Sequence, residues 1–140
     1  MSTRPKRKPR PVRIPVMPET HKVFAYQLHL SMNALRIAPA AEHFDCVGHC
    51  LNVIGTAVEH KPRFENVLAT INAGARAMNQ IAAKVTAIAA GADLKLHEYE
   101  LRPIELAVTA AEEVVPRLTI NELNAARLRV RATALAEALK

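Results

Sequence analysis

The chain has few of the residues on which small reactive or disulfide-bonded proteins depend. Its 140 residues include two Cys, four Gly and no Trp, and aromatic residues make up 4%. Two cysteines are too few for a disulfide framework. The four glycines are scattered, so they form no Gly-x-Gly-x-x-Gly turn, phosphate loop or Gly-x-Ser-x-Gly elbow. The nucleotide-binding and hydrolase classes that such glycine motifs mark are therefore excluded.

Long apolar runs are missing as well. The longest candidate, residues 67–90, is interrupted by two cations and three amides, so no stretch reaches the ~18 uncharged apolar residues of a membrane span. Residues 12–17 contain Arg13 and Pro15, which break the apolar segment that a secretory signal requires. Together with the low cysteine content, these absences predict a soluble protein of a reducing compartment, the cytoplasm.

Positive charge is abundant but unevenly placed. The net charge is +6, and residues 1–13 contain six cations and no acid, whereas the other 127 residues hold 13 Lys or Arg and 13 Asp or Glu. Five of the nine prolines lie in residues 1–18, and proline favours extended backbone without amide donors. We therefore predict a basic arm, extended or disordered, over residues 1–18 and a helical domain over residues 19–140. The cations of the arm are Arg4, Lys6, Arg7, Lys8, Arg10 and Arg13.

The domain has enough apolar material for a core, since half of all residues are apolar and the mean hydropathy is +0.02. Apolar residues recur three and four positions apart, which predicts helices. The first helix is expected from a Thr20 cap to Ala38, with Leu28, Leu35 and Ile37 among its core candidates. Pro39 is expected at the first position of the second helix.

The later helix boundaries follow from local signals. Pro62 is expected to open the third helix and Gly91 to end it, while residues 92–96 are too few to decide between a loop and a strand. A fourth helix either begins near Arg102 or bends at Pro103. Thr119–Glu122 is a capping box that starts a fifth helix running to about Leu139. The predicted fold is an all-α antiparallel bundle of four to five helices.

One group of residues has metal-ligand chemistry. His43, Cys46 and Cys50 fall on neighbouring angles of the second helix, while His49 points to its wetter side. Structural zinc sites draw ligands from two elements, and no second Cys or His pair matches this one. The sequence also contains no Glu-x-x-His and no His-Glu-x-x-His. We expect these residues at the edge of the core, with no catalytic residue, cofactor or metal.

The arm carries the clearest partner signal. Six unopposed cations can follow a phosphate backbone or enter a minor groove, which predicts nucleic-acid binding, DNA or RNA, through Arg4–Arg13. A protein-binding inhibitor or adaptor that uses a bundle face is the alternative. Arg127, Arg129 and Arg131 lie two residues apart on the last helix, about 200° around it, so they do not form one basic face. A homodimer through the third or fifth helix is a further possibility that would complete an alanine-rich core.

A resemblance points the same way. The segment Lys8–Pro15 (KPRPVRIP) and the run from Tyr99 to Glu113 resemble small phage- or prophage-encoded helical proteins that open with a basic Arg-Pro-Val leader. The resemblance implies an accessory protein of a bacterial host cytoplasm, either a DNA-associated regulator or an inhibitor of a host defence complex. It implies no catalytic residue.

Overall fold

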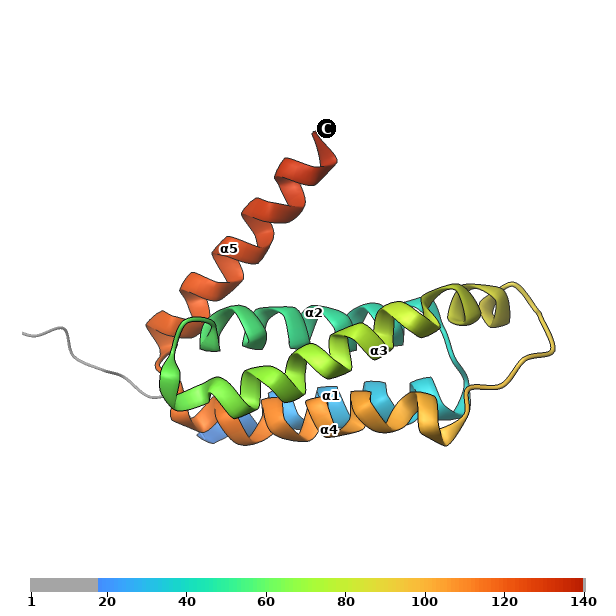
Figure 1. Ribbon diagram of the computed structural model, residues 1–140, viewed down its shortest axis with the longest axis horizontal. Coiled ribbons are helices and arrows are strands. Elements are labelled where there is room, and N and C mark those ends of the chain that lie inside the picture. The colour runs from blue at the N-terminus through green and yellow to red at the C-terminus, as the bar shows by residue number, and fades with distance from the viewer. Residues whose placement is uncertain (1–17, 140) are drawn as a thin grey trace, which may run out of the picture.

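Four antiparallel helices form a bundle and a fifth helix leaves it at an angle (Figure 1). The computed structural model describes residues 18–139, so the arm and its six cations lie outside the described residues. The all-α fold predicted from the sequence is confirmed. The elements are α1 (Pro18–Ile37), α2 (Ala41–Val58), α3 (Glu65–Ala89), α4 (Glu98–Val114) and α5 (Ile120–Ala138), with 3₁₀ turns η1 (Pro62–Phe64) and η2 (Val115–Arg117).

The core lies between the four bundle helices, each of which contacts the next along the chain, while α4 closes the ring against α1. The three- and four-residue spacing predicted this core because it places apolar side chains on one side of each helix. Ile37 is an exception, since it is 82% exposed at the last position of α1. The buried residues of α2 and α4 include Val47, Leu51, Ile54, Val58, Leu101, Ile104, Val108 and Ala111.

The closest helix contact joins α3 to α4 at Gly74. A Cβ atom built on Gly74 would lie 2.2 Å from the Cβ of Ala107 and 3.1 Å from the carbonyl oxygen of Pro103. Only glycine allows the two helices to approach this closely. Pro103 itself lies inside α4, which begins at Glu98. Of the two alternatives, the start near Arg102 is therefore wrong.

The end of α3 shows how local residues set a boundary. Gly91 has a φ of +96°, a conformation that residues with a Cβ adopt at a cost. Its N–H donates to the carbonyl of Ile88 at 3.0 Å, and the N–H of Ala92 donates to the carbonyl of Ala87 at 2.9 Å. These two bonds are the Schellman pattern. The predicted role of Gly91 is confirmed, and residues 92–97 form a loop rather than a strand.

The other helix starts differ slightly from expectation. Because α1 begins at Pro18, Thr20 lies inside its first turn and does not cap it. Pro39 precedes the N-cap residue Ala40 of α2 instead of occupying the first helical position. Pro62 opens η1, which leads directly into α3. Each observed helix start differs from the expected one by one to three residues, which is the usual uncertainty of a helix boundary.

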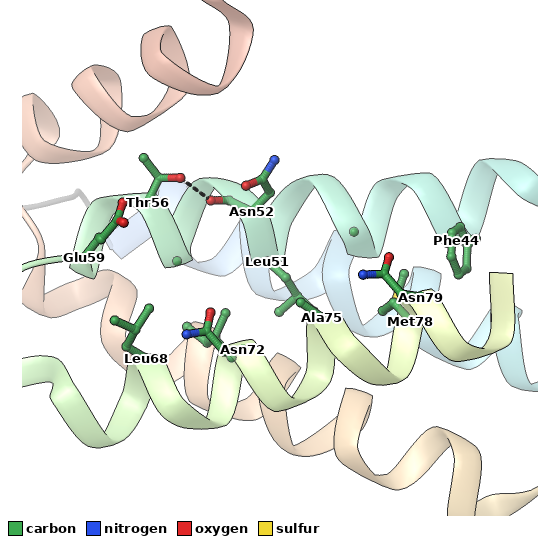
Figure 2. A pocket seen from close by; sticks show the side chains of 13 residues that line it. Phe44, Leu51, Asn52, Thr56, Glu59, Leu68, Asn72, Ala75, Met78 and Asn79 are labelled. Carbon is green, nitrogen blue, oxygen red and sulfur yellow. Dashed lines mark hydrogen bonds between the residues drawn. The ribbon is translucent and has the colours of Figure 1, made fainter. Parts of the chain in front are cut away.

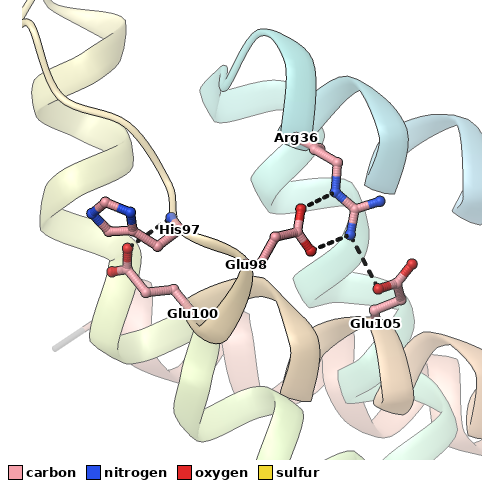
Figure 3. A network of polar contacts seen from close by, with 5 residues as sticks. All are labelled: Arg36, His97, Glu98, Glu100 and Glu105. Carbon is pink, nitrogen blue, oxygen red and sulfur yellow. Dashed lines mark hydrogen bonds and ion pairs between the residues drawn. The ribbon is translucent and has the colours of Figure 1, made fainter.

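Ion pairs join the helices at the far end of the bundle from α5. Arg36 at the end of α1 forms an ion pair with Glu98, whose Oε1 lies 3.1 Å from Nε, and its Nη2 donates a hydrogen bond to Glu105 at 3.1 Å (Figure 3). Lys84 of α3 bonds Glu100 at 2.7 Å. The carboxylate of Glu100 also accepts the N–H of His97 at 3.0 Å, which fixes the start of α4.

Candidate functional site

The first turns of α5 are firmly anchored to the bundle. The N–H of Glu122 donates to Thr119 Oγ1 at 3.1 Å, and the N–H of Thr119 donates to Glu122 Oε1 at 3.0 Å, which confirms the predicted capping box. Lys61 Nζ bonds the same carboxylate at 2.6 Å. Leu123 and Ala126 are buried where α5 contacts α2. The direction in which α5 leaves the bundle is therefore set by several independent contacts.

The later turns of α5 project away from the bundle (Figure 1). Every residue from 127 to 139 is exposed except Val130, which is half-buried. Leucines nevertheless continue there: Leu128 is 65% exposed, Leu135 59% and Leu139 87%. This projecting half therefore lacks most of the tertiary contacts that stabilise the other helices. Isolated helices shorter than ~12–15 residues are marginal in water.

The exposed leucines form one continuous line. With Ala132 they recur at spacings of four, three and four, which places them on one side of an α-helix. The residues of α5 that contact α2, such as Leu123, Ala126 and Val130, lie on the opposite side. We refer to Leu128, Ala132, Leu135 and Leu139 as the α5 stripe.

A groove lies between α2 and α3 (Figure 2). It has a volume of about 530 Å³ and opens to solvent beside the base of α5. Its walls combine apolar side chains with three amides, and two glycines of α2 leave its surface low. We refer to it as the α2–α3 groove; its lining includes Phe44, Gly48, Leu51, Asn52, Gly55, Glu59, Leu68, Ile71, Asn72, Ala75, Met78 and Asn79.

The α2 side of the groove and the surroundings of the stripe carry opposite charge. Residues 41–60 contain Glu42, Asp45 and Glu59 and no Lys or Arg, whereas residues 127–138 contain three Arg and one Glu. The two regions already meet at one point, where Arg129 Nη2 lies 3.8 Å from Glu59 Oε2. An exposed ion pair at this distance contributes little stability by itself. The net charge of each region is therefore a stronger indication of attraction than this one contact.

The cysteine cluster lies on α2. Cys46 and Cys50 are half-buried free thiols, His43 is half-buried and His49 is exposed. Within residues 18–139, no three His, Cys, Asp or Glu side chains come together in a way that could hold a metal ion. Burial, together with the neighbouring Cys46, raises the pKa of the Cys50 thiol to about 11. Cys50 is therefore a neutral thiol and a poor nucleophile at neutral pH.

The remaining sequence-predicted residues divide into two groups. Arg4, Lys6, Arg7, Lys8, Arg10 and Arg13 lie outside the described residues, so the structure does not place them. Arg127, Arg129 and Arg131 lie on the projecting half of α5, and all three are exposed. The α2–α3 groove was missed by sequence reasoning. Gly48 and Gly55, seven residues apart on one helix, were the signal that could have revealed a low surface there.

Scans against protein-family models, curated proteins and solved structures found no match to the chain. None of the helices within residues 18–139 combines the length and the apolar character that crossing a bilayer requires. The projecting half of α5, the α2–α3 groove and the charge distribution therefore carry what can be inferred about function.

Proposed function

We propose that the protein is a non-enzymatic accessory protein that binds nucleic acid through the basic residues between Arg4 and Arg13. The observation that carries the proposal is the separation of charge along the chain. Residues 1–13 hold six cations and no acid, whereas residues 18–139 hold 12 Lys or Arg and 13 Asp or Glu. Binding of such a segment to a phosphate backbone releases counterions, which drives association without a folded binding site.

The pairing of cations in the bundle supports this assignment. Arg36, Lys61, Arg63 and Lys84 all bond carboxylates of other elements. These cations are occupied in holding the helices together and are poor candidates for phosphate contacts. The bundle as a whole supplies no excess positive charge to compete with the arm.

The point of attachment of the arm also supports the proposal. Pro18 begins α1 at the end of the bundle where η2 lies and where α5 starts (Figure 1). The chain segment that precedes Pro18 therefore joins the bundle at the same end as the three arginines of α5.

The salt dependence of binding tests the proposal. We expect the intact chain to bind a DNA or RNA duplex with a slope of log K against log salt of roughly −5, from about −0.9 for each of six contacts. A truncated chain that starts at Pro15 should lose most of the affinity and of the slope. The matched control is Arg127→Gln/Arg131→Gln in the intact chain, which should keep most of the slope. Equal binding by the intact and truncated chains, or no binding by either, contradicts the proposal.

A protein-binding inhibitor or adaptor is the second candidate. The exposed apolar side chains of the α5 stripe favour it, because apolar surface of this extent often marks protein contacts. A pull-down with added nuclease separates the two functions, since a protein partner is kept and a nucleic-acid-dependent partner is lost. The phage origin and the bacterial cytoplasm implied by the Arg-Pro-Val leader stay predictions that accord with either function.

A further inference from the structure

The α5 stripe cannot be covered by the bundle from which it projects. The side of α5 that faces α2 carries Leu123, Ala126 and Val130, and the stripe lies on the other side of the same continuous helix. Turning the stripe inward would break the capping box at Thr119 and expose Leu123. A covering surface must therefore come from outside the bundle.

The α2–α3 groove has the dimensions of a site for this stripe. The stripe extends from Leu128 to Leu139, eleven residue steps or about 16 Å at 1.5 Å per residue. The lining residues of α2 run from Phe44 to Glu59, about 22 Å by the same measure. Gly48, Gly55 and Ala75 are small, so a helix with leucine and alanine on one side can lie close to the groove.

The charges flanking the two surfaces are complementary. Arg127, Arg129 and Arg131 flank the stripe, whereas Glu59 lines the groove at the end of α2. Glu42 and Asp45 are exposed on the same helix, against one exposed cation, Arg76, on the α3 side. Opposite charges around an apolar contact favour one orientation and raise the rate of association. Since stripe and groove belong to the same chain, a second copy brings both surfaces to the contact.

We propose that two copies of the chain form a dimer in which the α5 stripe of each lies in the α2–α3 groove of the other. Such an interface is isologous, because the same two surfaces are buried twice. A pairing of the two stripes with each other would bury only about three helical turns per copy, whereas stable dimers bury roughly 1,200 Å² or more in total. The reciprocal arrangement adds the groove of each copy to the buried surface. It does not depend on nucleic-acid binding.

Sedimentation of nuclease-treated protein over a range of concentrations tests the dimer. The stripe variant, Leu128→Glu/Leu135→Glu, and the groove variant, Ala75→Arg, should both be monomeric at concentrations where the wild-type chain is dimeric. All three positions are exposed in one copy, so both variants should retain the helical content of the wild type. Leu106→Glu on α4 and Ala69→Arg on α3 are matched controls at exposed positions outside the groove, and both should stay dimeric.

Mixing the two monomeric variants distinguishes the proposed contact from stripe-to-stripe pairing. The stripe variant keeps an intact groove and the groove variant keeps an intact stripe, so the mixture should form a weak heterodimer through one of the two contacts. A wild-type chain that stays monomeric up to its solubility limit overturns the proposal. A dimer that survives Ala75→Arg, or variants that never complement each other, overturns it as well.

Discussion

The bundle and the projecting half of α5 are built from the same pattern of residues, yet they differ in what their apolar side chains contact. Ile104 on α4 and Leu135 on α5 both belong to lines of apolar residues spaced three and four apart, but Ile104 is fully buried and Leu135 is 59% exposed. The comparison shows that spacing identifies the apolar side of a helix without identifying the surface that covers it. The bundle buries one side of each of its own helices, whereas it leaves the α5 stripe exposed.

The largest effect should come from removing side-chain volume in the bundle. Ile104→Ala should lower the free energy of unfolding by about 2–5 kcal/mol, because it removes buried methyl groups and leaves a cavity. Leu135→Ala should change it by within about 0.5 kcal/mol in dilute protein. Urea unfolding followed by circular dichroism measures both.

Protein concentration separates the two variants further. The cost of Leu135→Ala should grow as the dimer forms, because association stabilises only chains that retain the stripe. A cost for Leu135→Ala that is large at every concentration would show that α5 packs on its own bundle.

The second prediction compares the contact of α3 with α4, at Gly74, and the contact of α3 with α2, at Gly48. Gly74→Ala should cost about 1–3 kcal/mol, because the new Cβ would collide with Ala107 and approach the carbonyl of Pro103. Gly48→Ala is the matched control: its Cβ would meet only the Cε of Met78, at 3.5 Å, and alanine favours the helix by up to about 1 kcal/mol. Equal costs at the two positions in urea unfolding would contradict the close α3–α4 contact.

The third prediction concerns acid. The hydrogen bond from Lys84, followed by that from the His97 backbone, lowers the pKa of Glu100. The pKa of Glu122 is also lowered. Burial raises this pKa, but the hydrogen bond from Lys61 and the capping-box bonds with Thr119 together lower it by more. Both carboxylates therefore contribute stability that is present above about pH 4.5, their ordinary pKa, and is lost as the pH falls through the lower folded-state values.

Unfolding free energies measured between neutral and acidic pH test this linkage. Glu100→Gln and Glu122→Gln should each reduce the loss of stability on acidification, because the variant has no proton to bind at that position. Glu113→Gln on the exposed side of α4 makes the same change in net charge and serves as the control. An unchanged acid slope in both test variants would contradict the prediction.

The smallest effect is kinetic and concerns the alkylation rate of Cys50 on α2. Because the pKa of Cys50 is about 11, its alkylation in the folded protein should still rise about tenfold per pH unit between pH 9 and 10. Mass spectrometry of the Cys50 peptide after brief iodoacetamide treatment measures the rate. In urea the rise should level off near the ordinary value of 9.0. A folded protein that levels off at the same pH would show that this side of α2 is open to solvent.

The sequence predicts those features of the fold that depend on neighbouring residues. The Thr119–Glu122 box and the Gly91 terminus need only a few adjacent backbone groups, and both are found as expected. Pro103 was harder to interpret, since its disfavoured position is stabilised partly by the cap of α4 and partly by contact with another helix. The Glu100 bond to His97 fixes the start of α4, and the contact with Gly74 holds the helix against α3.

The candidate site could be predicted only in part. The charge of the arm can be read directly from the composition, whereas the α2–α3 groove exists only because Phe44 and Leu51 of one helix lie beside Leu68 and Met78 of another. The direction of α5 is also non-local, because α5 has apolar residues on two sides and the Lys61–Glu122 pair selects which side contacts α2. Periodicity alone gives both sides equal weight.

The loop after Gly91 lies at the end of the bundle away from α5 and from Pro18 (Figure 1). A biotin-accepting peptide inserted between Ala92 and Asp93, both exposed, would attach the protein to a sensor surface by this end. The start of α1, the stripe and the end of the groove beside α5 would then all face the solution. One immobilised preparation could measure duplex binding and self-association in the same orientation.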